Sequence, residues 1–257
     1  MGVDAEHGGM VMPESLAKTE VVAVPALSDN YIWMLRDPAT GEVAVVDPGQ
    51  DAPALDAADA RGWRITQILI THWHPDHTGG TSGIKAATGA TVTAPAEAER
   101  LSPVDRMVAE GDRVSFGELD AEVWEIPAHT AGHIAFYFAE AKMIFVCDTL
   151  FAMGCGRLFE GTADQMFANM ARFADLPDDV RIFCGHEYTL ANARFAAHVD
   201  PDNAAVTERL AKIGAMRGRG EVTLPSTIGE ERATNPFLRA ADVADLARLR
   251  TMKDSFG

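Results

Sequence analysis

A short histidine-rich segment in the first third of the chain has the residue types and spacing of a metal-binding motif. The string THWHPDH supplies four potential ligands: His72, His74, Asp76 and His77. Because alternate residues of an extended chain point the same way, His72 and His74 can face one ion together. A turn at Pro75 then lets Asp76 and His77 face a second position. Imidazole and carboxylate are ligands of divalent ions such as zinc and iron, so the segment predicts a metal site.

Three more potential ligands follow apolar runs that are typical of β-strands. His129, Asp148 and His186 each come shortly after such a run. Taken singly, each is an ordinary loop residue, because aspartate often forms turns and histidine often makes loop hydrogen bonds. Since all three follow strands, the fold can gather them with the first segment at one edge of its sheets.

The order HxHxDH, followed by separate His, Asp and His residues, resembles the metallo-β-lactamase superfamily, and every ligand position holds the expected residue type. The resemblance implies an α+β fold, a four-layer αββα sandwich with two divalent ions at one edge. Zinc is the first expectation for these ions, with iron or manganese as alternatives. Two ions bring about +4, and two aspartates with one hydroxide remove about 3, so the site stays electrophilic. The implied ligands are His72, His74 and His129 for the first ion, Asp76, His77 and His186 for the second, and Asp148 as a bridge between them.

The composition excludes several classes of function. The chain has 257 residues, 47% of them hydrophobic, which is enough to bury a sizeable core. A formal net charge of −16 argues against binding to nucleic acid or to an anionic membrane surface. No stretch approaches the roughly 20 apolar residues that cross a bilayer. Three cysteines without a CxxC pair favour reduced thiols, so we expect a cytoplasmic protein. A monomer is a separate expectation, because no feature of the sequence indicates the oligomeric state.

The predicted elements divide the chain into three parts. Residues 1–20 lack an apolar signal segment and are expected to form an N-terminal tail. Residues 21–190 form the predicted catalytic domain, and residues 191–257 form a helical substrate-binding domain without strand signals. Strands are predicted at 21–25, 31–35, 43–46, 65–70, 113–116, 119–126, 134–138, 143–146 and 181–184. Helices are predicted at 51–61, 163–173, 191–198, 203–216 and 241–253.

Longer strings narrow the resemblance to the glyoxalase II family, the hydroxyacylglutathione hydrolases. The strings are LSDNY at 27–31, GCGR at 154–157, EGTA at 160–163, CGHEYT at 184–189, NPFLR at 235–239 and RTMKD at 250–254. The resemblance runs from about residue 21 to the C-terminus. It implies hydrolysis of the thioester S-D-lactoylglutathione to D-lactate and glutathione, the second step of methylglyoxal detoxification.

The chemistry of a thioester agrees with this resemblance. The leaving thiol has a pKa near ~8.5, so the thiolate can depart without a dedicated general acid. A metal-bound hydroxide would attack the carbonyl, and one ion would stabilise the developing oxyanion. Asp76 would orient the hydroxide in addition to binding metal, which makes it the expected catalytic residue.

Glutathione carries carboxylates, so an acidic protein needs a local cationic site to bind it. The family resemblance implies that Arg157, Arg250 and Lys253 bind the glycine carboxylate and that Tyr188 lines the same pocket. Arg250 and Lys253 lie three residues apart in a predicted helix and therefore share a face. Phe159 stands where the family often has tyrosine, and Arg157 where lysine is common. The alternative is that these basic residues are ordinary solvated side chains.

Other functions of the same fold stay open at this point. A glutathione persulfide dioxygenase would use one iron held by His72, His129 and Asp148. Another thioesterase, a nuclease or a non-catalytic binding protein are further alternatives. His133 is expected to be structural. Cys155 lies in a glycine-rich loop that could expose its thiol, but a catalytic role for it is not expected because a metal-bound hydroxide already supplies a nucleophile.

Overall fold

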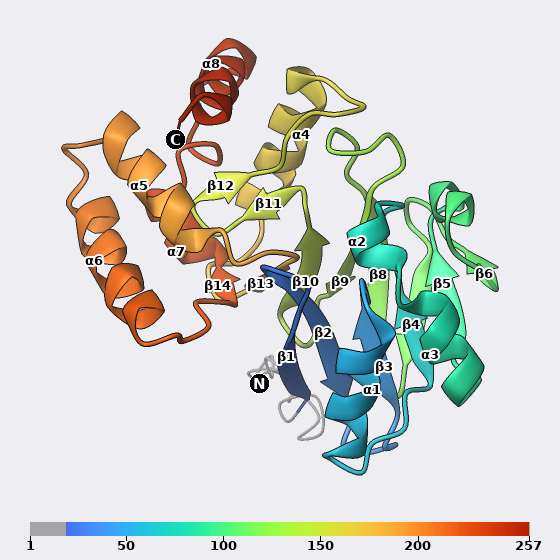
Figure 1. The fold of residues 1–257 in the computed structure, drawn as a ribbon. Helices are drawn as coiled ribbons and strands as arrows, with labels where there is room; N and C mark the ends of the chain where they lie inside the picture. The colour runs from blue at the N-terminus through green and yellow to red at the C-terminus, as the bar shows by residue number, and fades with distance from the viewer. Residues whose placement is uncertain (1–18, 257) are drawn as a thin grey trace, which may run out of the picture.

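Within residues 19–256, which the computed structural model describes, two six-stranded β-sheets pack face to face (Figure 1). Sheet A has the strands in chain order: β1 (Glu20–Ala26), β2 (Asn30–Arg36), β3 (Val43–Val46), β4 (Gln67–Leu69), β5 (Thr91–Ala94) and β6 (Arg106–Met107). Sheet B has the order β14-β13-β10-β9-β8-β7, formed by β7 (Arg113–Phe116), β8 (Leu119–Glu125), β9 (Ile134–Phe138), β10 (Met143–Cys147), β13 (Arg181–Cys184) and β14 (Ser226–Thr227). A separate hairpin joins β11 (Leu150–Phe151) to β12 (Gly154–Cys155).

Sheet A is apolar on both faces because helices cover its outer side. Along β2, Trp33 and Leu35 belong to the core between the sheets, whereas Ile32 and Met34 belong to the core on the outer face. This alternation follows from the two-residue period of a strand. The outer core is closed by α1 (Asp51–Asp59) and α3 (Thr81–Thr88).

The outer face of sheet B is covered by α4 (Ala163–Ala174). A capping box starts this helix, since Thr162 accepts from the Gln165 N–H and the Gln165 side chain accepts from the Thr162 N–H. Its apolar face buries Met166, Met170 and Phe173 in the same core as the sheets. The layers therefore run helix, sheet, sheet, helix, which confirms the predicted αββα sandwich.

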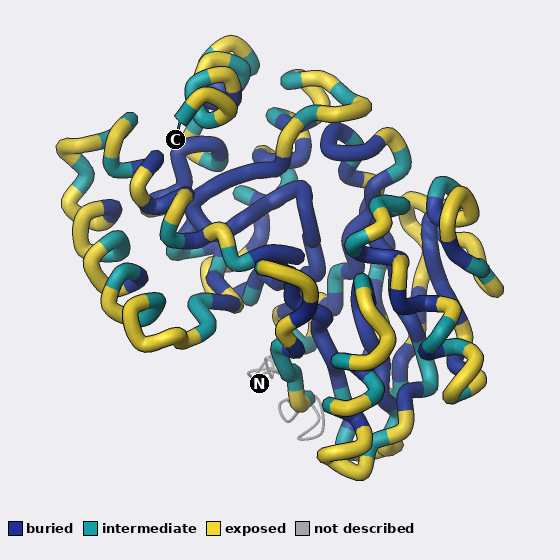
Figure 2. Tube along the Cα trace, viewed as in Figure 1, coloured by how far each residue is buried: buried dark blue, intermediate teal, exposed yellow. Residues whose placement is uncertain are grey.

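The C-terminal part of the chain forms a group of helices beside the sandwich, at the left of Figure 1. They are α5 (Thr189–Val199), α6 (Ala204–Gly218), α7 (Ile228–Thr234) and α8 (Val243–Asp254). Figure 2 shows their inner faces buried and their outer faces exposed. Phe195, Phe237 and Leu249 join the main core. The expectation of no strand in this part is wrong, because β14 pairs antiparallel with β13. Two residues are too few to give an apolar run in the sequence.

Between residues 75 and 107 the structure forms short elements that the sequence did not predict. Besides α3, β5 and β6, they are the helix α2 (Pro75–Thr78) and the 3-10 helix η2 (Ala96–Arg100). At the N-terminal side, Glu20 already belongs to β1, and the rest of the predicted tail up to residue 18 lies outside the described residues. None of the helices in the described part of the chain has the length and apolarity to span a membrane.

Candidate metal centre

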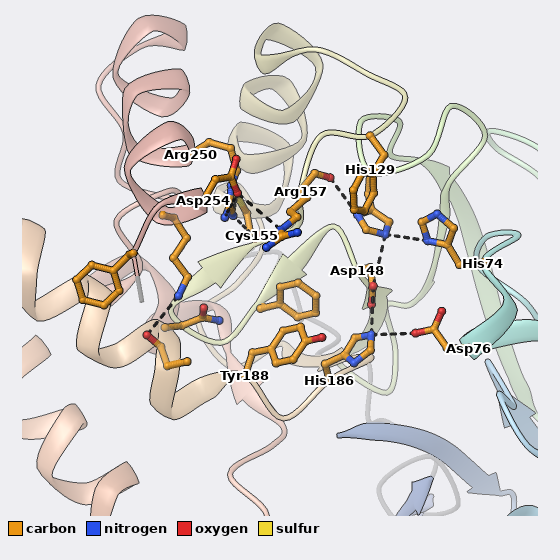
Figure 3. A pocket seen from close by; sticks show the side chains of 16 residues that line it. His74, Asp76, His129, Asp148, Cys155, Arg157, His186, Tyr188, Arg250 and Asp254 are labelled. Carbon is orange, nitrogen blue, oxygen red and sulfur yellow. Dashed lines mark hydrogen bonds and ion pairs between the residues drawn. The ribbon is translucent and has the colours of Figure 1, made fainter. Parts of the chain in front are cut away.

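The loops that follow β4, β8, β10 and β13 meet at one edge of the two sheets, and they carry the predicted ligands (Figure 3). Pro75 begins α2, where its missing N–H costs nothing, and this helix turns Asp76 and His77 inward. At the ends of β3 and β10, Asp47 and Cys147 have φ values of 51° and 42°. Left-handed backbone is uncommon outside glycine, although aspartate tolerates it better than cysteine, and it is often found at functional sites.

Three imidazoles form the first group. His72 Nε2 and His129 Nε2 each lie 3.1 Å from His74 Nδ1. Nitrogens bound tetrahedrally to one zinc at about 2.0–2.1 Å would lie roughly 3.3 Å apart, so the spacing fits an ion. Burial lowers the pKa of all three histidines, that of His72 well below its usual range, which favours the neutral form that binds metal.

The second group contains Asp76, His77 and His186. Asp76 Oδ2 lies 3.2 Å from His77 Nε2 and 3.5 Å from His186 Nε2. Asp148 Oδ2 lies between the two groups, 3.4 Å from His129 Nε2 and 3.3 Å from His186 Nε2 (Figure 3). The structure thus brings the seven predicted ligands together, with the Asp148 carboxylate between the two groups.

The donor set of the second group also fits a cation. His77 Nε2 is buried and makes no hydrogen bond within the described residues. Burial disfavours the charged form of Asp148, yet His77 and His186 hold the pKa of this carboxyl well below its usual range. Gly185 leaves the necessary space, because a Cβ there would lie 2.6 Å from Asp148 Oδ1 and 2.8 Å from His77 Cε1. Divalent metal ions therefore fit the cluster.

Hydrogen bonds to the Nδ1 atoms, on the side of each ring that faces away from the cluster, orient the imidazoles of His72 and His129. The Thr71 hydroxyl donates to Asp47 Oδ2 at 2.8 Å, so its oxygen is left to accept from His72 Nδ1 at 3.0 Å. His129 Nδ1 donates to the Arg157 carbonyl at 3.0 Å. With Nδ1 protonated in this way, the Nε2 lone pair of each ring points into the cluster.

The loop between β1 and β2 orients two ligands of the second group. Asp29 Oδ1 accepts from His186 Nδ1 at 2.8 Å, and Asn30 Nδ2 donates to Asp76 Oδ2 at 3.1 Å. Glu187 connects this loop to the C-terminal part of the chain through hydrogen bonds. Its backbone N–H donates to the Asp29 carbonyl, and its carboxylate accepts from Tyr31 and Thr223.

A cavity of about 480 Å³ leads from the cluster toward α8. Its size is that of a small-molecule site. The five predicted substrate-binding residues all line this cavity: Arg157, Phe159, Tyr188, Arg250 and Lys253.

The cavity wall near the cluster is aromatic. The Tyr188 ring stacks on His186 with centroids 4.7 Å apart. Phe159 is 60% exposed, and its ring makes edge contacts with His129 and His74. Cys155 is not exposed by its glycine-rich loop, since β12 holds it in the cavity wall at 5% exposure. Burial raises its thiol pKa to about 11, which makes it a poor nucleophile.

Two family models together cover most of the chain. The metallo-beta-lactamase superfamily matches residues 27–186, and the hydroxyacylglutathione hydrolase C-terminus matches residues 187–256. A hydroxyacylglutathione hydrolase from Cereibacter sphaeroides is 50% identical over 88% of this chain and 89% of its own length. One from Methylococcus capsulatus is 46% identical over 90% of both. The chain belongs to the hydroxyacylglutathione hydrolase family. The resemblance stated from the sequence strings is thereby confirmed.

Solved structures agree on the fold. The chain is similar to ETHE1 from Myxococcus xanthus, with a TM-score of 0.69, 22% identity and coverage of 91% of this chain and 89% of that one. It is also similar to TTHA1623 in a di-iron-bound form, with a TM-score of 0.61, 24% identity and coverage of 85% and 99%. At these identities the likeness concerns the metallo-β-lactamase fold alone.

Sequence reasoning missed the residues that orient the predicted ligands. Asp29 and Asn30 lie in the LSDNY string, and Glu187 lies in CGHEYT, so the family strings already marked them. Their roles depend on contacts between distant segments, which spacing along the chain does not reveal. Thr71 begins the THWHPDH string, whereas Asp47 had no motif signal beyond its place at a strand end.

Proposed function

We propose that the protein hydrolyses S-D-lactoylglutathione to D-lactate and glutathione. One observation carries this proposal: a single cavity joins a seven-ligand cluster at one end to Arg157, Arg250 and Lys253 at the other. A glutathione thioester fits this layout, with its carbonyl at the cluster and its glycine carboxylate at the three cations.

The cluster is proposed to hold two divalent ions, with zinc as the first expectation and iron or manganese as alternatives. His72, His74 and His129 would hold one ion, and Asp76, His77 and His186 the other, with Asp148 between them. When bound, such ions polarise a carbonyl and lower the pKa of water to near 7.

The protein's own residues position the reactants. Asp76 lines the cavity, and its side chain is 39% exposed, so its carboxylate can orient the attacking water. Asn30 fixes that carboxylate through its 3.1 Å hydrogen bond. The departing glutathione thiolate needs no general acid, because a thiol of pKa about 8.5 is a good leaving group near neutral pH.

The main rival is a glutathione persulfide dioxygenase that uses one iron on His72, His129 and Asp148. The second group argues for the hydrolase. It is complete, and Asp29 and Asn30 orient two of its members at hydrogen-bond distance. One iron on His72, His129 and Asp148 would leave this second group without a metal.

The deciding experiment follows loss of the thioester absorbance of S-D-lactoylglutathione while metal is counted in the same preparation. We expect turnover with about two ions per chain. If there is no turnover, and the protein instead holds one iron per chain and consumes oxygen with glutathione persulfide, the protein is a persulfide dioxygenase and the proposed hydrolase function is wrong.

We further propose a cytoplasmic monomer in which residues 21–190 do the chemistry and residues 191–257 complete the substrate site. The three cysteines are free and buried, as suits a reducing compartment. Tyr188, at the boundary of these parts, lines the cavity together with Arg250 and Lys253 of α8. Light scattering of the purified protein tests the monomer.

A further inference from the structure

The cationic end of the cavity contains a carboxylate of the protein's own. Asp254, the last residue of α8, lines the cavity beside Arg157, Arg250 and Lys253 (Figure 3). Its Oδ1 accepts from Arg250 Nε at 3.0 Å and from Arg250 Nη2 at 2.7 Å. The same oxygen lies 3.8 Å from Arg157 Nε.

With the contact to Cys155, these bonds occupy three of the five N–H donors of Arg250, including the Nε–Nη2 edge that could bind a carboxylate with two hydrogen bonds. The remaining terminal nitrogen of Arg250, Nη1, donates to the Cys155 carbonyl at 2.7 Å. The guanidinium of Arg250 is therefore hydrogen-bonded to Asp254 on one side and to Cys155 on the other, and the Arg250 side chain is only 8% exposed. Lys253 and Arg157 differ: Lys253 Nζ donates to the Ala191 carbonyl at 3.3 Å, and Arg157 is 65% exposed.

An ordinary surface pair at i, i+4 spacing would have both partners in solvent and little effect on binding. Here the arginine is buried, and the carboxylate borders the cavity where an anionic ligand is proposed to bind. At short distances in a site partly shielded from water, like charges repel appreciably.

We propose that Asp254 is an internal competitor for the glycine carboxylate of glutathione, and that it limits the affinity of the site so that the product leaves. The inference rests on the proposed function, because it concerns the same cavity. Asp254 holds Arg250 in place and cancels part of its charge. The ligand carboxylate is then received mainly by Arg157 and Lys253, against the repulsion of Asp254.

The test compares Asp254→Asn with Asp179→Asn. The first removes the charge from the cavity and keeps an oxygen that can accept from Arg250. The second removes one charge at an exposed aspartate that pairs with Lys142 outside the cavity. Calorimetry measures the Kd of glutathione and of its glycine ethyl ester, and kinetics measures KM for S-D-lactoylglutathione.

We expect D254N to lower both the Kd of glutathione and KM by about three- to tenfold. The Kd of the ethyl ester, which lacks the glycine charge, should stay unchanged, and D179N should match the wild type. An unchanged or raised Kd of glutathione overturns the proposal, as does equal tightening of the ester.

If D254N does not fold, Asp254→Ser removes the charge, keeps an oxygen acceptor and carries the same expectations. The proposed function is tested separately by the wild type. Absent wild-type turnover of S-D-lactoylglutathione refutes that function, whereas normal turnover with an unaltered Kd in D254N refutes only the competitor role.

Discussion

The two ends of the cavity are built in different ways. The metal end takes its ligands from loops after four strands of both sheets, and most of these side chains are buried and held by hydrogen bonds from behind. The cationic end comes from one helix and one loop, and Arg157 there is 65% exposed. A rigid end suits bond breaking, which needs fixed geometry. The less enclosed end sets affinity, which can change without loss of the chemistry.

The largest effect is expected from Asp148→Ala. This variant removes the carboxylate between the two ligand groups, so kcat should fall about a thousandfold or more and metal content should drop. The sheets should stay intact by circular dichroism. Both ions retained with a near-normal rate would contradict the proposed site.

A smaller effect at the same end is expected from Asp29→Ala. The lost hydrogen bond to His186 should weaken binding of the second ion by about 10- to 100-fold while the first ion stays bound. Metal titration followed by elemental analysis separates the two, with Asp179→Ala as the control for loss of an aspartate. Equal loss of both ions would mean that Asp29 supports the fold and not one ligand.

At the cationic end, Arg250→Ala and Lys253→Ala should separate binding from stability. Lys253→Ala should raise KM about tenfold, and Arg250→Ala should raise it by a smaller factor, because Arg250 already donates to Cys155 and Asp254. Both variants should leave metal content unchanged. Arg250→Ala should also lower Tm by several degrees, since it breaks the bonds to Cys155 and Asp254, whereas Lys253→Ala should not. An unaltered KM in both variants would mean that Arg250 and Lys253 do not bind the substrate.

The smallest effect is expected from Phe159→Tyr, which adds a hydroxyl to an exposed ring at the cavity mouth. One added hydrogen bond to glutathione would lower KM about two- to fivefold with kcat unchanged. Kinetics at fixed metal content measures this. A change in kcat would mean that Phe159 affects the chemical step at the metal end of the cavity and not only the binding of glutathione.

The fold and the ligands could be predicted because their signals are local. Strand β10 is an unbroken apolar run, and His72 to His77 stand in one short segment. Strand β14 was not predicted because it has only two residues, which form a strand only by pairing with β13. Asp29 escaped prediction for a related reason, since its partner His186 lies 157 residues away. The pairing of Asp254 with Arg250 was within reach, because helix residues four apart lie side by side.

The ligands come from both sheets, and this has a consequence for folding. His72 and His74 follow a strand of sheet A, whereas His129 and His186 follow strands of sheet B. Each proposed ion is therefore a cross-link between the halves of the sandwich, one that the unfolded chain cannot form. At free metal about 1,000 times above Kd, one such ion adds roughly 4 kcal/mol to the free energy of unfolding. The folded fraction of this protein, and not only its turnover, would then follow the cell's supply of metal.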